Sequence, residues 1–268
     1  MPNSFARLRW SHLRAKLTLR VILGRSLFLA MSLLATGGVV THESLIGSSV
    51  VAAYHPVNPR AIAVITDPGL VNIISFGRTN QATSTGTGIV ISANGLVVTN
   101  AHVVARARLI EVTLGTSAMV YAAKIIARDP GEDIALLQVF GIHGLHPLPW
   151  SRTSSPETET SIAVIGNAHG YCGTPIVTTG KVIATNLGVT IGVPTEHRYE
   201  SLPDMIEVDA KVIPGDSGGV VVNSHGVILG MTTSTNLREH VGYAIAAPEV
   251  LSVIHRLRTE HTSHRSSG

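Results

Sequence analysis

The chain has 268 residues, of which 44% are hydrophobic and 14% charged, so it can bury one large or two modest cores. Its formal net charge of +3 arises in residues 1–25, which hold six basic residues and no acidic one, whereas the rest holds 14 basic and 17 acidic residues. This distribution argues against a nucleic-acid partner, which would need basic residues clustered on the folded domain.

Residues 1–40 predict an export signal. The basic head is followed by Ser26–Val40, an uncharged and largely apolar run of 15 residues. It is shorter than the ~18 residues expected of a membrane-spanning helix and suits the apolar core of a signal peptide. Ala35-Thr36-Gly37 offers small residues of the kind that signal peptidase accepts, but an uncleaved signal anchor is an open alternative. In both cases we expect the rest of the chain outside the cytoplasm, secreted or in the cell envelope, with membrane contact through this segment if it is retained.

The first half of the folded chain is predicted to consist of short strands. Residues 41–68, which include Pro56, Pro59 and Pro68, are expected to be a linker. Residues 69–148 hold short runs of β-branched and apolar residues between turn residues, as is typical of strands. The predicted strands are Val71–Phe76, Thr87–Ser92, Leu96–Thr99, Leu109–Leu114, Val120–Ala127 and Ile134–Val139.

Two polar residues at the ends of these strands are candidate catalytic groups. His102 lies in a short turn after an apolar strand, and Asp133 directly precedes another strand. Side chains in these places can meet over a cleft. Each residue taken alone could equally belong to an ordinary surface turn or loop cap, and Glu132 is a weaker candidate for the acid.

The second half, residues 149–258, begins after a crossing rich in Pro, Ser and Thr at residues 147–156. Its predicted strands are Ser161–Ile165, Ile176–Ala184, Val189–Val193, Met205–Val208, Val220–Val222, Val227–Thr233 and Tyr243–Ala246. About six short strands in each half indicate an all-β fold of two antiparallel six-stranded barrels rather than a parallel sheet.

Ser217 lies in the most informative motif, Gly215-Asp216-Ser217-Gly218-Gly219. Glycines on both sides allow a sharp turn that exposes the serine hydroxyl and lets main-chain N–H groups converge on one negatively charged oxygen. The motif also fits the G-x-S-x-G elbow of α/β-hydrolases. That class needs its acid and histidine after the serine, whereas here His102, Asp133 and Ser217 follow the order His, Asp, Ser.

One helix is predicted at the C-terminal end, from Pro248 to Arg258, with apolar residues on one face. Residues 259–268 are expected to form a disordered tail. This tail holds His261 and His264, but a histidine pair without a third ligand is weak evidence for metal, so we expect no metal and no cofactor. Cys172 is the only cysteine, which excludes an intramolecular disulfide, and we expect it to be a partly buried side chain.

In combination, these motifs resemble the trypsin-like serine proteases of the HtrA/DegP broad type, and more closely their PepA-type secreted bacterial branch. The resemblance covers about residues 69–258. It rests on the stretches GTGIVI, TNAHVV, EDIALLQV, VIGNAHGYCGTPIVTTGKVIA, EVDAKVIPGDSGG, GVILGMTTS and VGYAIA.

The resemblance implies barrels of chymotrypsin type and an attack by Ser217 on a peptide carbonyl, with His102 as general base and Asp133 orienting it. The N–H groups of Gly215 and Ser217 are expected to form the oxyanion hole, and Asp216 is expected to brace this loop. The ten residues after Arg258 are too few for the PDZ domain that such proteins usually append.

The resemblance also places Lys211 at the floor of the primary substrate pocket. Its ammonium could draw in an acidic substrate residue; alternatively it turns to solvent and leaves a pocket lined by apolar groups such as Ile213 and Met231, which favours small aliphatic residues. Val220 departs from the family pattern, which usually has proline there.

The sequence therefore predicts an exported serine endopeptidase that acts on proteins or peptides through an acyl-enzyme intermediate. Two alternatives are a non-catalytic relative that binds or holds proteins on the same barrels, and an esterase of the α/β-hydrolase type. The oligomeric state cannot be predicted from the residues.

Overall fold

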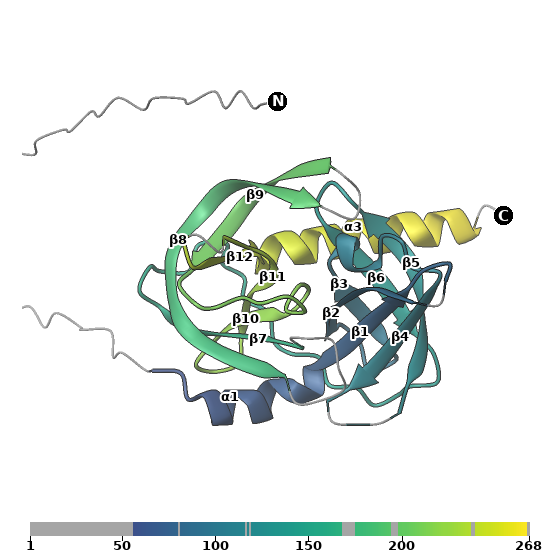
Figure 1. Cartoon of the computed structure of the whole chain (residues 1–268), viewed down its shortest axis with the longest axis horizontal. Helices are drawn as coiled ribbons and strands as arrows, with labels where there is room; N and C mark the ends of the chain where they lie inside the picture. Colours follow the sequence, from purple (N-terminus) through teal and green to yellow (C-terminus); the bar gives the residue numbers. More distant parts are fainter. Residues whose placement is uncertain are drawn as a thin grey trace, which may run out of the picture. The chain divides into compact units, whose positions relative to one another are not determined.

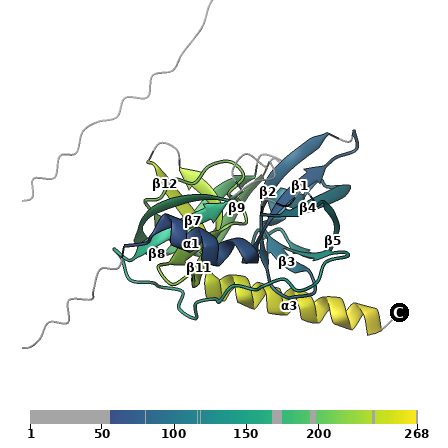
Figure 2. The ribbon, with the colours of Figure 1, turned by 90° about the horizontal axis from the view of Figure 1, so that it is seen from below.

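The computed structural model describes residues 56–79, 81–115, 117, 119–167, 175–193, 198–236 and 239–266. Within these ranges, two β-barrels lie side by side, with one helix before the first barrel and a long helix after the second (Figure 1, Figure 2). The predicted export signal lies outside the described residues. In the part of the chain that is described, no helix has the length and apolar character needed to cross a membrane.

The first barrel is closed and antiparallel, with the strand order β1-β2-β3-β6-β5-β4. Its strands are β1 (Leu70–Phe76), β2 (Ala82–Val90), β3 (Leu96–Thr99), β4 (Leu109–Leu114), β5 (Tyr121–Asp129) and β6 (Ile134–Val139). Pairing of β4 with β1 closes the barrel. Because side chains alternate between the two faces of a strand, Val71, Ile73, Val97 and Leu137 point inward and form part of its core.

The second barrel has the order β10-β11-β12-β9-β8-β7 and is also closed and antiparallel. Its strands are β7 (Ser161–Gly166), β8 (Ile176–Val193), β9 (Arg198–Val208), β10 (Val220–Asn223), β11 (Ile228–Asn236) and β12 (Val241–Ala246). The predicted fold of two antiparallel six-stranded barrels is therefore confirmed. A parallel sheet, which the α/β-hydrolase alternative requires, is absent from the described residues.

Strand β8 differs from the two separate strands that the sequence predicted for its range. It pairs with β9 along most of its length, with register shifts between Val182 and Val189. Asn186, inside this stretch, has a positive φ of 56°. Bulges of this kind absorb extra residues and bend a strand without ending its pairing, which explains why polar residues did not break the strand.

Helix α1 (Pro59–Thr66) forms within the range in which we expected a linker. Its start has strong local signals, because the Asn58 side chain accepts hydrogen bonds from the N–H groups of Arg60 and Ala61, and Pro59 occupies the first turn. Ile62 anchors the helix in the protein core. A short 3-10 turn (Asp67–Gly69) leads from α1 into β1.

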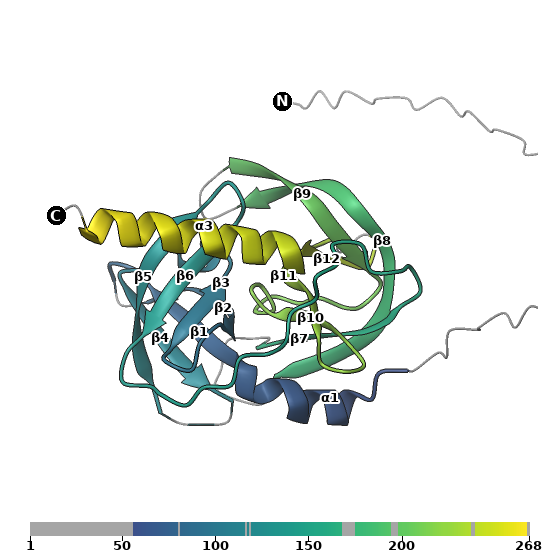
Figure 3. The same ribbon diagram turned by 180° about the vertical axis from the view of Figure 1, so that it is seen from behind.

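Helix α3 (Ala247–Ser266) lies across both barrels (Figure 3). It contacts β5 and β6 of the first barrel and β11 and β12 of the second. Its buried residues share one apolar cluster with both barrels; examples are Val253 of α3, Leu136 of β6 and Val220 of β10. The helix therefore contributes to the core that joins the two barrels.

The end of α3 corrects the prediction of a disordered tail. The helix continues eight residues past Arg258, to Ser266. The polar composition suggested disorder, but no glycine or proline interrupts residues 249–266. Thr259 and Thr262 donate side-chain hydrogen bonds to the carbonyls of the preceding turn, so their hydroxyls are satisfied within the helix.

Candidate active site

The loop that carries Ser217 begins with a tight turn. The N–H of Asp216 donates to the carbonyl of Ile213 (3.0 Å), with Pro214 and Gly215 at the corners. Gly215 has a φ of 104°, and proline followed by a glycine with positive φ is typical of a type II turn. The carboxylate of Asp216 strengthens the turn by accepting a hydrogen bond from the N–H of Ile213 (2.9 Å).

Two N–H groups of this loop are free to bind a ligand. In the described part of the chain, the N–H groups of Gly215 and Ser217 donate no hydrogen bond, whereas those of Asp216, Gly218 and Gly219 all donate to carbonyls. A buried N–H group without an acceptor is rare in proteins, and Gly215 is buried. Two such donors on one turn suit a negatively charged oxygen.

Hydrogen bonds between the barrels hold the Ser217 loop against β2. The carbonyl of Ser217 accepts a hydrogen bond from the N–H of Thr87 (2.8 Å), and the Thr87 hydroxyl donates to the carbonyl of Gly215 (2.9 Å). Gly218 has a φ of 80°, and a Cβ atom there would lie 2.2 Å from the Thr87 carbonyl oxygen and 2.4 Å from the Thr99 hydroxyl. Only glycine allows this close approach.

His102 and Asp133 meet at one end of the first barrel. Helix α2 (Ala101–Val104), which follows β3, presents His102. Its Nδ1 atom lies 3.0 and 2.9 Å from the two carboxylate oxygens of Asp133, and its main-chain N–H donates to Oδ1 (3.0 Å). Because Nδ1 faces acceptors, the imidazole proton lies on Nδ1 and Nε2 is left to accept a proton. Asp133, and not the neighbouring Glu132, is thus the carboxylate in contact with His102.

Thr233 joins these groups, a role that the sequence did not predict. Its hydroxyl donates to Oδ2 of Asp133 (2.5 Å), and its carbonyl accepts a hydrogen bond from the Ser217 hydroxyl (3.3 Å). Its place in the stretch GVILGMTTS was the one signal in the sequence, and a threonine in a strand is too common to single out.

Ser217 and His102 line the same cavity, which has a volume of about 220 Å³. The other described residues that line it are Ile191, Gly192, Val212, Ile213, Pro214, Thr233, Ser234 and Thr235. Of the three residues predicted for the substrate pocket, Ile213 lies here. Lys211 is exposed to solvent, and Met231 is fully buried in the core between the barrels.

Two other residues that the sequence singled out, Val220 and His261, do not line this cavity. Val220 is fully buried in β10, where it pairs with Ile165 and Met231. Cys172 lies outside the described residues. His261 lies on α3, and no three His, Cys, Asp or Glu residues in the described ranges are grouped so as to hold a metal ion.

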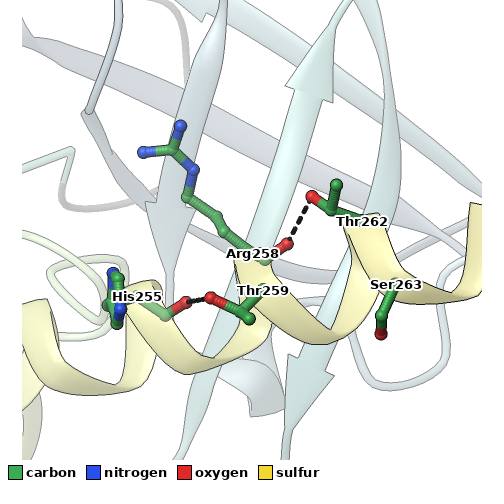
Figure 4. A pocket seen from close by; sticks show the side chains of 5 residues that line it. All are labelled: His255, Arg258, Thr259, Thr262 and Ser263. Carbon is green, nitrogen blue, oxygen red and sulfur yellow. Dashed lines mark hydrogen bonds between the residues drawn. The ribbon is translucent and has the colours of Figure 1, made fainter. Parts of the chain in front are cut away.

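A second cavity, of about 580 Å³, lies along the C-terminal half of α3 (Figure 4). Its described lining residues are His255, Arg258, Thr259, Thr262 and Ser263. All three hydroxyls donate to carbonyls of the helix itself, and the dashed lines in Figure 4 mark the bonds of Thr259 and Thr262. None of the predicted catalytic residues lines this cavity, so it is separate from the candidate active site.

Comparison with known proteins agrees with this geometry. Residues 86–231, more than half of the chain, match the trypsin-like peptidase domain. The chain is 32% identical over 197 residues to the mitochondrial serine protease HTRA2 of Bos taurus, which covers 71% of this chain and 41% of the relative. It is 29% identical over 196 residues to a probable periplasmic serine endoprotease, DegP-like, of Rickettsia prowazekii, which covers 71% of this chain and 36% of the relative. The chain thus spans about two fifths of the length of these curated relatives.

Two solved structures resemble the described fold. The active form of the Rv3671c protease from M. tuberculosis matches with a TM-score of 0.65 and 25% identity, over 76% of this chain and 88% of that chain. The HtrA-type protease AlgWS227A with tripeptide matches with a TM-score of 0.62 and 28% identity, over 73% of this chain and 62% of that chain.

Proposed function

Because this chain belongs to the family of trypsin-like peptidase domains, we propose that it is a serine endopeptidase that uses His102, Asp133 and Ser217. The observation that carries the proposal is the pairing of the buried Asp133 carboxylate with Nδ1 of His102, in a cavity that His102 shares with Ser217. Homology to HtrA and DegP proteases supports the same reaction class.

The proposed mechanism follows from the positions of the proton donors and acceptors. The Ser217 hydroxyl attacks the peptide carbonyl while Nε2 of His102 takes its proton, and His102 then gives that proton to the leaving amine. Asp133 keeps the imidazole in the required tautomer and stabilises its positive charge. The free N–H groups of Gly215 and Ser217 bind the negatively charged oxygen of the tetrahedral intermediate, and water hydrolyses the acyl-enzyme.

An extended substrate can add to the edge of β11. This strand pairs with β12 up to Asn236, whereas its pairing with β10 ends at Met231. Among the described strands, the edge at Ser234 and Thr235 is therefore open, next to Ser217. A peptide that pairs there in an extended conformation would bring its carbonyl to the serine, which favours an endopeptidase over an esterase.

The cavity favours a small aliphatic side chain on the substrate. Ile191, Val212 and Ile213 supply apolar walls in a volume of about 220 Å³. The solvent exposure of Lys211 supports the apolar reading of the pocket over selection of acidic residues. Cleavage of a peptide library by wild type and Lys211→Ala tests this proposal, and a preference for Asp or Glu that the substitution abolishes would contradict it.

We also propose that the enzyme acts outside the cytoplasm. The support is the basic and apolar pattern of residues 1–40 together with the similarity to probable periplasmic proteases. Cleavage of this segment and its retention as an anchor are both open alternatives. The placement of the chain in the PepA-type branch stays a prediction. Mass spectrometry of the mature N-terminus distinguishes cleavage from retention.

Labelling with a fluorophosphonate probe is the most direct test of the proposed activity. We expect the wild type to be labelled and Ser217→Ala to be unlabelled, because the probe phosphonylates an activated serine. Ser201→Ala, a change of an exposed serine in β9, is the matched control and should be labelled like the wild type. A folded wild type that stays unlabelled would favour the alternative of a non-catalytic binding protein.

A further inference from the structure

The carboxylate of Asp129 caps the turn that precedes Asp133, in which the N–H of Asp133 also donates to the carbonyl of Pro130 (3.4 Å). Oδ1 of Asp129, the last residue of β5, accepts hydrogen bonds from the N–H groups of Gly131 (2.9 Å) and Glu132 (3.2 Å). The turn then ends in Asp133 with a φ of 52°, a left-handed conformation that aspartate adopts more readily than most residues with a Cβ atom.

The other oxygen of the Asp129 carboxylate binds helix α3. Nη1 of Arg256 lies 2.8 Å from Oδ2 of Asp129, and about half of the arginine side chain is exposed. Helix α3 crosses both barrels (Figure 3), and Arg256 reaches from it to the turn that carries the candidate catalytic acid. A charge-assisted hydrogen bond of this kind adds direction as well as attraction.

The negative charges around the turn make its structure depend more strongly on the positive charge of Arg256. Burial raises the pKa of Glu132, and the charges of Glu249 on α3 and of Asp129 raise it further, while Arg256 acts in the opposite direction. Burial also acts to raise the pKa of Asp129, but hydrogen bonds from Arg256, Glu132 and Gly131 outweigh it, so that this pKa is lowered. Without the guanidinium, the carboxylates of the turn and of α3 would repel each other.

We propose that Arg256 is a positioning residue for the catalytic acid: through Asp129 it holds the turn that fixes Asp133 against His102. The role as a catalytic acid rests on the function proposed above. Arg256 acts through another residue and lines no part of the cavity next to Ser217. The C-terminal helix would then be a component of the acid–base machinery in addition to its place in the core.

The proposal predicts a specific kinetic signature. The described residues of the substrate cavity other than His102 come from the second barrel and its loops. Loss of Arg256 should therefore lower kcat and leave KM nearly unchanged. For Arg256→Gln we expect kcat to fall about tenfold, which corresponds to ~1.4 kcal/mol of barrier height. Arg256→Lys keeps the charge and should recover a large part of the rate.

Arg258→Gln is the matched control. Arg258 lies on the same helix and lines the second cavity (Figure 4), and it has no ion pair among the described residues. This variant should keep the kcat of the wild type. Asp129→Asn retains an oxygen for the N–H groups of the turn but removes the charge, so its effect and that of Arg256→Gln should not be additive in the double variant. An unchanged kcat in a folded Arg256→Gln, or an equal loss in Arg258→Gln, would overturn the proposal.

A spectroscopic readout separates this inference from the proposed function. The proton on Nδ1 of His102 gives a far-downfield proton resonance when it bonds a carboxylate, whether or not the protein hydrolyses peptides. We expect this resonance to shift or broaden in Arg256→Gln and to be unchanged in Arg258→Gln, with thermal unfolding confirming that both variants are folded. An unlabelled wild type with this pattern would refute the peptidase alone. If the resonance of Arg256→Gln were the same as that of Arg258→Gln, the role of Arg256 would be refuted and the proposed peptidase activity would not.

Discussion

The two barrels contribute different kinds of groups to the candidate site. The first barrel supplies His102 and Asp133, which contact each other directly through hydrogen bonds of 2.9 to 3.0 Å. The second supplies Ser217, the free N–H groups and nearly all of the cavity wall. In the proposed mechanism, the first barrel would therefore carry out proton transfer, and the second would bind the substrate and stabilise the developing charge. We therefore expect substitutions in the first barrel to lower kcat with little effect on KM, and substitutions in the cavity wall of the second barrel to change KM.

Asp133→Asn should have the largest effect on this division. The amide would present a donor to Nδ1 of His102 and favour the wrong tautomer, so kcat for peptide hydrolysis should fall about 10⁴-fold with little change in KM. Steady-state kinetics measures both constants. Asp204→Asn is the control, because Asp204 has the same φ of 52° but lies exposed in β9. If KM of Asp133→Asn rose by a factor as large as the fall in kcat, the roles of the two barrels would not be separable.

Gly218→Ala should weaken the attachment of the serine loop to the first barrel. The new methyl group would collide with the carbonyl of Thr87, and the φ of 80° disfavours any residue with a Cβ atom. We expect the free energy of unfolding to fall by about 3 kcal/mol, as measured by denaturant titration. Gly188→Ala, at a position where a Cβ would meet no atom within 4 Å, should change it by less than about 1 kcal/mol. Similar losses in both variants would refute the steric argument.

Thr233→Val should show a smaller effect where the two halves meet. Valine has nearly the same shape but removes the hydroxyl that donates to Asp133, while the main-chain carbonyl that binds Ser217 is kept. Hydrogen bonds to charged groups contribute about 1.5–3 kcal/mol, so kcat should fall roughly tenfold or more. Thr233→Ser retains a hydroxyl and should stay close to the wild type. A loss in the serine variant as large as in the valine variant would point to packing instead.

Glu132→Gln should have the smallest effect, and its sign depends on pH. The pKa of Glu132 is raised in the folded chain, so between the unfolded and folded pKa values the unfolded state binds fewer protons. Stability contributed by this group therefore falls as pH rises through that window. Glutamine carries no charge, so the variant should be more stable at pH 7 by less than about 1 kcal/mol, and the gain should vanish in acid. Thermal unfolding at pH 7 and in acid measures this difference in stability. A variant less stable than the wild type at pH 7 would contradict the raised pKa of Glu132.

The barrels were predictable from the sequence because strand signals are local. Alternating apolar residues and Gly or Pro turns mark most of the strands, and motif order singled out His102, Asp133 and Ser217, whose catalytic roles remain predictions. Elements that depend on context were harder to predict. The bulges that keep β8 continuous require the partner strand β9, and the end of α3 is helical in a stretch whose composition resembles a tail.

The site residues that the sequence missed depend on tertiary contacts. Thr233 becomes relevant only because β11 brings it to Asp133, and Arg256 only because α3 crosses to the first barrel. For Lys211 the family resemblance left two orientations open, into the pocket or toward solvent, because the position of a residue in a loop does not determine the direction of its side chain. Its observed exposure follows from the path of the chain between β9 and β10.

The hydrogen bonds between the barrels also bear on the order of folding. Thr87 and Gly215 are 128 residues apart in the sequence, and Thr233 and Asp133 are 100 apart. Closing loops of this length has a large entropic cost, and contacts between distant residues slow folding. Each barrel can gather its own strands earlier, through shorter loops. We therefore expect the complete site to be among the last parts of the molecule to form, so that a partly folded chain has no peptidase activity.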